Sequence, residues 1–217
     1  MAQNSSYNIL PDPTSGSLWL VLPPWGTSSR AASEILLDLV ARLVFRGSVR
    51  VVDGNNRFDA HYCSRLIARN LHAGLGREVQ GKSLADLLGR IYIARAFTCY
   101  QMLTLLGEIP AGNQPGNPPT LVMDFLATFY DENVSVGEAR RLLDVCLAHL
   151  RRLGRYAPVL VSTRPAPSEQ LTCSRDVLLE ALMAVADRTW RLEAPSPSVS
   201  QLSLPLPGEF VPASVVK

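Results

Sequence analysis

Asp124 is the residue whose type and position in the chain most directly suggest chemistry. It follows the apolar run Leu121–Met123, so the pattern places a carboxylate at the end of a buried strand. A carboxylate at that position can hold a magnesium-bound water. The alternative is a structural role, in which the same carboxylate caps a neighbouring loop or helix.

The segment Pro23–Ser29 follows the first predicted strand, where a phosphate loop would stand. Such a loop needs glycines whose N–H groups wrap a phosphate, a lysine for the β- and γ-phosphates, and a hydroxyl for magnesium. This segment has one glycine, Gly26, and no lysine; its Trp25 either fills the space of a nucleotide or is a partly buried anchor. A shift in register brings Arg30 to the lysine position, although its fork does not fit a lysine pocket. Arg30 and Asp124 are therefore the candidates for a degenerate nucleotide site, without conventional ATP hydrolysis.

Several arginines of one predicted helix are candidates for contacts with nucleic-acid phosphates. The alternative is a solvated helix face, because acidic side chains and water are sufficient partners for them. The histidines and cysteines share no ligand spacing, so the sequence predicts no metal site, and it predicts no bound cofactor. The candidate arginines are Arg140, Arg141, Arg151 and Arg152.

The composition indicates a single globular domain. The chain has 217 residues, 47% of them hydrophobic and 18% charged, with a net charge of +2. No stretch of about 18 consecutive apolar residues is present, so no membrane span is expected. The first residues lack the basic start and apolar core of a secretory signal. Four scattered cysteines are typical of reduced, buried thiols, and together these features predict a cytoplasmic protein.

Apolar strands alternate with amphipathic helices along the chain, which predicts an α/β fold with a mostly parallel twisted sheet and helices on both faces. The predicted domain spans 18–193, after a flexible segment 1–17 and before a Pro-rich tail 194–217. The tail is predicted to be either disordered or extended, and an extended tail can pair with a sheet edge. The predicted strands are 18–22, 48–53, 91–95, 121–127, 157–165 and 187–193, and the predicted helices are 29–46, 59–70, one near 83–90, 97–108, 135–154 and 174–186.

Three segments, in order, resemble the RecA/RadA-type recombinases, and the likeness is greatest to the recombinase paralogues. "VRVVDGNNRFDAHYCSRLIARN" resembles the second core strand and helix of that family, and "IYIARAFTCYQMLTLL" resembles its Ala-Arg-Ala-Phe segment and following helix. The stretch from "LVMD" to "VLVSTRP" resembles the Walker B strand, the next helix and the strand after it. The likeness covers roughly residues 18–193 and implies a RecA-like P-loop NTPase core.

The departures from that family bear on function. The Gly-Lys-Thr of the Walker A loop is missing, the catalytic glutamate falls on Asn55, and the polar sensor falls near Arg164, so of the hydrolytic set only Asp124 is kept. An amide cannot take a proton as a carboxylate does. The stretch 166–173 is short for the family's second DNA-binding loop, which weakens a DNA role.

The resemblance and its departures together predict a non-catalytic accessory protein of DNA recombination and repair. Its expected partner is a protein, either a RecA/RadA-type recombinase or a second copy of this chain. The alternative is a nucleotide-binding ATPase or switch that uses an unorthodox phosphate loop with Arg30 and Asp124.

Overall fold

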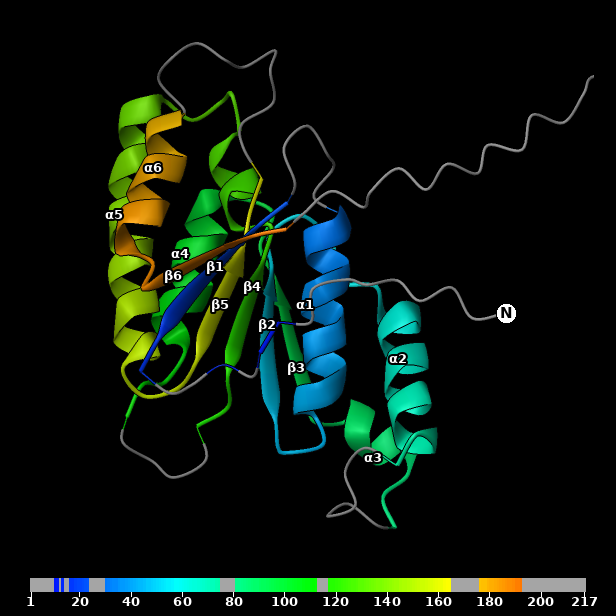
Figure 1. Cartoon of the computed structure of the whole chain (residues 1–217). Helices are drawn as coiled ribbons and strands as arrows, with labels where there is room; N and C mark the ends of the chain where they lie inside the picture. Colours follow the sequence, from blue (N-terminus) through cyan, green and yellow to red (C-terminus); the bar gives the residue numbers. More distant parts are fainter. Residues whose placement is uncertain are drawn as a thin grey trace, which may run out of the picture.

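The computed structural model describes residues 10–11, 13, 16–23, 30–74, 81–112, 117–164 and 176–192, with Arg30 and Ala31 described by their backbone alone. In this part of the chain six strands form one sheet in the order β3-β2-β4-β5-β1-β6, and every strand pair is parallel (Figure 1). The prediction of a parallel α/β sheet is confirmed. The strands are β1 (Leu18–Leu22), β2 (Val49–Asp53), β3 (Ile91–Arg95), β4 (Thr120–Met123), β5 (Val159–Ser162) and β6 (Arg188–Arg191).

Helices cover both faces of this sheet. α1, α2 and α3 lie on one side of it, and α4, α5 and α6 lie on the other (Figure 1). Each connects two parallel strands, which requires a crossover over one face. The helices are α1 (Arg30–Leu43), α2 (Ala60–His72), α3 (Leu84–Leu88), α4 (Cys99–Glu108), α5 (Val136–Gly154) and α6 (Asp176–Val185), with a 3₁₀ helix η2 (Phe125–Phe129) after β4.

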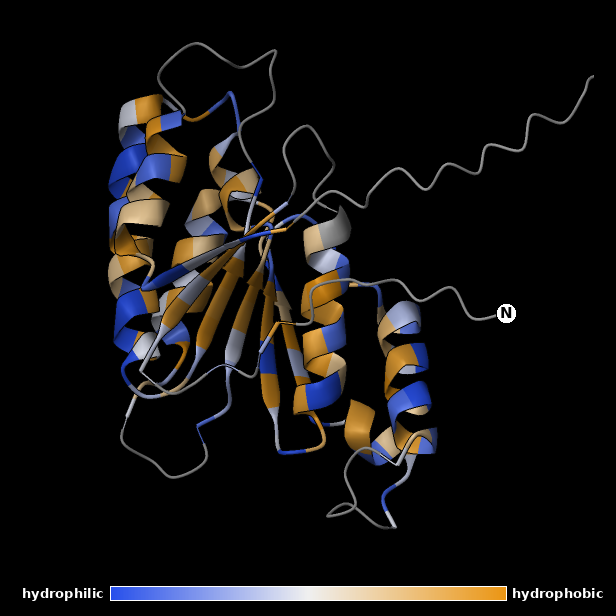
Figure 2. Cartoon of the chain, viewed as in Figure 1, coloured by the Kyte–Doolittle hydropathy of each residue, from blue (hydrophilic) through white to orange (hydrophobic). Residues whose placement is uncertain are grey.

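The central strands are apolar on both faces because each face packs against helices (Figure 2). In β1, Trp19 and Val21 point into the core formed with α1 and α2, whereas Leu18, Leu20 and Leu22 point into the core formed with α4, α5 and α6. All five side chains are at most 2% exposed. The sheet therefore has a separate hydrophobic core on each face. Burial of one such side chain stabilises the fold by roughly 1.5–3 kcal/mol.

The helix starts follow local capping rules. Asp59, Ser83, Thr98 and Ser135 each accept a backbone N–H of the first turn of α2, α3, α4 and α5, respectively. In the first turn of α5 the carboxylate of Glu138 pairs with Arg141 at 2.8 Å.

The end of one strand and the burial of two others differ from the sequence prediction. The strand predicted at 121–127 ends at Met123, because Asp124 adopts a left-handed conformation and η2 begins directly after it. The strands are not all uniformly buried, since β3 and β6 form the two edges and expose part of their side chains. An edge strand has one neighbour instead of two, so its outer side is open to water.

Part of the predicted organisation lies outside the described residues, namely residues 24–29 with Trp25 and Gly26, the short stretch 166–173 and the tail 194–217. Within the segment 1–17 that the sequence predicts as flexible, Leu10 is buried, and its carbonyl accepts a hydrogen bond from Arg42 at 2.9 Å. None of the described helices is long and apolar enough to cross a membrane.

Candidate functional site

Two buried aspartates stand at the carboxyl ends of neighbouring strands. Asp53 ends β2 and Asp124 follows β4, and both side chains are at most 1% exposed. The strand ends are held close together, because the N–H of Gly54 donates to the carbonyl of Met123 at 2.8 Å. A Cβ atom on Gly54 would lie 2.9 Å from the carbonyl oxygen of Asp124, so only glycine fits at this position.

Asp53 organises the loop that follows its own strand. Its carboxylate accepts the backbone N–H groups of Asn55, Arg57 and Phe58 at 3.3, 2.8 and 3.0 Å. The Nε atom of Arg95, at the end of β3, lies 3.5 Å from its Oδ2 atom. Three N–H donors and one guanidinium satisfy this buried charge, so Asp53 fixes the path of the chain after β2.

Asp124 is surrounded by three donor side chains, two from the loop after β2 and one from the segment after β5. Its Oδ2 atom accepts a hydrogen bond from Nδ2 of Asn55 at 2.9 Å and lies 3.4 Å from Nε of Arg57 and 3.8 Å from Nε of Arg164. Its backbone N–H donates to Oγ of Ser162, and its φ of 50° and ψ of 47° are left-handed. A non-glycine residue in this conformation costs of order 1–3 kcal/mol, which the surrounding contacts must offset.

The chemical capacity of Asp124 follows from these contacts. A magnesium ion needs carboxylate oxygens or bound water facing it. Here one oxygen of Asp124 already contacts two guanidinium groups and an amide, and the other, Oδ1, is buried without a hydrogen-bond partner among the described residues. No group of three or more His, Cys, Asp or Glu side chains that could hold a metal occurs in the described part of the chain.

The structure brings together the three residues that the family resemblance assigns to the hydrolytic set. Asn55, Asp124 and Arg164 follow β2, β4 and β5, and the first and last both contact the carboxylate of the second. Arg30 begins α1, but its side chain is not described, so its pairing with Asp124 as a nucleotide site stays a prediction.

No protein-family model matches this chain, and no curated protein matches it. A fold by itself does not specify an activity, so the side chains of the site carry the functional information.

Sequence reasoning did not find Asp53, Arg57 and Arg95 as site residues. Asp53 and Arg95 each end a predicted strand, and a charged residue after an apolar run is the signal that could have found them. Arg57 gives no comparable signal, since it lies in a loop and reaches Asp124 across 67 residues of sequence.

The candidate nucleic-acid residues of α5 are mostly bound within the fold. Arg140 pairs with Asp144 at 3.0 Å, and Arg141 pairs with Glu138 at 2.8 Å. Nη2 of Arg152 donates to three carbonyl oxygens at the end of α4, which neutralises the negative end of that helix. Contacts with nucleic acid through these arginines stay a prediction.

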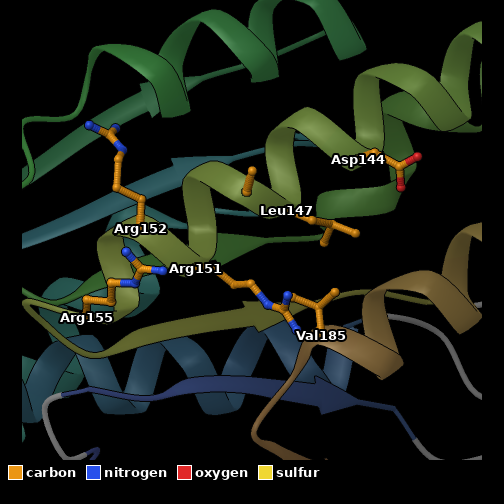
Figure 3. A pocket seen from close by; sticks show the side chains of 7 residues that line it. Asp144, Leu147, Arg151, Arg152, Arg155 and Val185 are labelled. Atoms are coloured by element: carbon orange, nitrogen blue, oxygen red, sulfur yellow. The ribbon is translucent and has the colours of Figure 1, made fainter.

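Arg151 lies in a groove of about 560 Å³ between α5 and α6 (Figure 3). Because α5 runs opposite to the strands, its C-terminal half is at the far end of the sheet from Asp124 (Figure 1). This groove is therefore separate from the aspartate site. Its lining residues are Asp144, Leu147, Ala148, Arg151, Arg152, Arg155 and Val185.

Proposed function

We propose that this chain is a RecA-like accessory protein that does not turn over nucleotide and acts by binding a protein partner, a RecA/RadA-type recombinase. The observation that carries the proposal is the engagement of Asp124 by Arg57, Arg164 and Asn55. Hydrolysis needs this carboxylate free for magnesium and needs a base to activate water. In this structure arginines occupy the carboxylate that magnesium would need. The amide of Asn55, which stands at the position of the base, cannot accept a proton from water.

The open edge of the sheet at β3 supports binding of a protein partner. The N–H of Val49 donates to the carbonyl of Arg90, and the N–H of Ala96 donates to the carbonyl of Asp53. Backbone groups alternate in direction along a strand, so those of Ile91, Ile93 and Arg95 face outward. Among the described residues no strand pairs with this edge. An extended segment of a partner could add there as a seventh strand.

The side chains along this edge are unusually apolar for an exposed surface. Of the seven large hydrophobic side chains that are exposed in the described part of the chain, four lie between residues 92 and 100. Tyr92 and Ile93 are successive residues of β3, so they point to opposite faces of the sheet. Exposed aromatic side chains along one edge segment are typical of interaction sites. We call these four the edge patch: Tyr92, Ile93, Phe97 and Tyr100.

The first experiment measures ATP turnover with magnesium, with and without single-stranded DNA. We expect no turnover above the blank, and no change in the isosteric variant Asp124→Asn, with folding checked by thermal melting. Turnover that disappears in Asp124→Asn would overturn the non-catalytic proposal. Magnesium-dependent nucleotide binding that is lost in Arg30→Ala would favour the alternative of a nucleotide switch.

The second experiment measures binding of the purified recombinase from the same cells by calorimetry. Ile93→Pro removes an outward N–H without removing a bond to β2, and Phe97→Ala removes a side chain that is 69% exposed. Each is expected to weaken binding by at least about tenfold, as truncation of an interface hot spot does. The control Tyr156→Ala removes an aromatic ring that is 41% exposed outside the edge patch and should leave binding unchanged.

Two results would contradict the partner assignment. One is self-association of the chain that is abolished by Ile93→Pro, which would make a second copy the partner. The other is the absence of recombinase binding both in the full chain and after removal of residues 194–217.

A further inference from the structure

Three guanidinium groups converge on the aspartate site from different segments. Arg57 lies in the loop after β2, Arg95 ends β3, and Arg164 follows β5. Their side chains are 34%, 45% and 35% exposed, so each has one end in the protein and the other at the surface. The guanidinium groups of Arg57 and Arg164 approach the same oxygen atom of Asp124. The guanidinium of Arg95 pairs with Asp53, whose carboxylate also accepts the backbone N–H of Arg57.

Each of the three forms an ion pair through its Nε atom, and for Arg57 this contact is also a hydrogen bond. The partners are the buried carboxylates of Asp53 and Asp124, at distances of 3.4 to 3.8 Å. The Nη atoms, which carry four of the five N–H donors of a guanidinium, form no hydrogen bond to any described residue. The two aspartates thus position three guanidinium groups through their Nε atoms and leave the Nη donors available for a ligand.

The charge balance at this place favours an anion. Three guanidinium groups face two carboxylates, so the cluster carries one excess positive charge. α4 begins just after Arg95 with the uncharged cap Thr98, and the positive end of its dipole adds to the potential there. Ligands of parallel α/β sheets bind beyond the carboxyl ends of the strands, which is where these side chains lie.

We propose that Arg57, Arg95 and Arg164 form a binding site for the phosphate dianion of a small molecule. Arginine forks match the geometry of phosphate oxygens, and a tetrahedral group can accept bonds from several forks at once. Asp53 and Asp124 are positioning residues in this site, because they orient the guanidinium groups and do not contact the ligand. The site does not rest on the proposed partner-binding function, since it needs neither magnesium nor hydrolysis.

The test is calorimetric titration of the full chain with inorganic phosphate at constant ionic strength set by chloride. Arg95→Gln and Arg164→Gln are each expected to weaken phosphate binding by roughly tenfold or more, because each removes charge-assisted hydrogen bonds. Arg95→Lys keeps the charge beside Asp53 but lacks the fork, so it should fold normally and still bind phosphate more weakly. The control Arg69→Gln removes an arginine in the last turn of α2 that is 66% exposed and pairs with Asp38, and it should bind as the parent does.

Three ligands distinguish the source of the phosphate. Tight binding of inorganic phosphate without competition by AMP identifies the free anion as the ligand, whereas competition by AMP identifies a phosphomonoester. A single-stranded oligonucleotide without terminal phosphates that displaces inorganic phosphate would overturn the assignment to a small molecule. The proposal is also overturned by the absence of heat with both phosphate and AMP, or by an equal loss of binding in Arg69→Gln.

Discussion

Nδ2 of Asn55 donates a hydrogen bond to Oδ2 of Asp124 at 2.9 Å, across the gap between the ends of β2 and β4. An amide in this position stabilises a carboxylate, whereas a second carboxylate would oppose it. The contact therefore stabilises the fold, and the two side chains do not form an acid–base pair that could activate a water molecule. This contact makes the first prediction possible.

Asn55→Asp replaces the NH₂ group that donates to Asp124 by a carboxylate oxygen and should destabilise the fold. At pH 8 two carboxylate oxygens would face each other in place of a hydrogen bond, although Oδ2 of Asp124 would keep its contacts with Arg57 and Arg164. Loss of one donor to a buried acceptor costs about 1–3 kcal/mol. The loss should diminish at acidic pH, where one carboxyl takes up a proton and donates to the other. Urea unfolding at pH 8 and pH 5 measures both effects.

Asn133 supplies the matched control for this substitution. Its Nδ2 atom donates to Oδ1 of Asp131 at 2.9 Å, the same chemistry at the same distance, but on the exposed loop before α5. Asn133→Asp should therefore cost well under about 1 kcal/mol. Equal losses in the two variants would mean that the Asn55 pair is not special to the buried site.

Gly54→Ala is the second prediction and tests the close approach of the two strand ends. The added Cβ would lie 2.9 Å from the carbonyl oxygen of Asp124 and 3.1 Å from that of Met123, and neither backbone group can move freely. Overpacking of this kind lowers the free energy of unfolding by about 1–3 kcal/mol. The control Gly137→Ala, in the first turn of α5, meets nothing within 4 Å and should not destabilise the protein. Unchanged stability of Gly54→Ala would contradict the described packing.

The parallel sheet could be predicted from the sequence because its central strands are short apolar runs between amphipathic helices. β1, buried on both faces, has no polar side chain at all, and a strand with that pattern fits only between two helical layers. The end of β4 could not be predicted, because Phe125 and Phe129 are as apolar as a strand and are buried under helices as part of η2 instead.

The edge position of β3 and the arginine cluster were also beyond the sequence. The letters of "IYIAR" are as apolar as those of a central strand, and only the strand order shows that one side is open. Asp124 and Asn55 were singled out by the resemblance, but the pairing of Arg57 and Arg95 with buried aspartates depends on contacts between distant segments. Spacing in a single sequence carries no such information.

The third prediction concerns the buried thiols. Burial raises the pKa of Cys63 and of Cys146 to about 12, with a smaller effect from Asp59 on the first and from Cys99 on the second, and burial also raises the pKa of Cys99. The thiolate is the reactive form, so at pH 8 the native protein should not react at these positions. In the Cys173→Ser variant, Ellman's reagent should release no colour until denaturant is added. Rapid labelling of that variant without denaturant would contradict the burial of the three thiols.

The last prediction concerns His149, which lies on α5 beside Gly107 of α4. Burial, and to a lesser degree the charge of Arg152, lowers the pKa of its imidazole below the ordinary value of 6.5. The unfolded chain then binds a proton more readily than the folded one, so the free energy of unfolding should fall as the pH is lowered through about 6.5 and below. His149→Gln should remove this part of the pH dependence in urea unfolding between pH 7.5 and 5.5. His61→Gln, on the exposed side of α2, is the control and should keep the slope of the parent. If the parent protein becomes more stable as the pH falls from 7.5 to 5.5, the folded protein favours the protonated imidazole. That result would contradict the burial of His149.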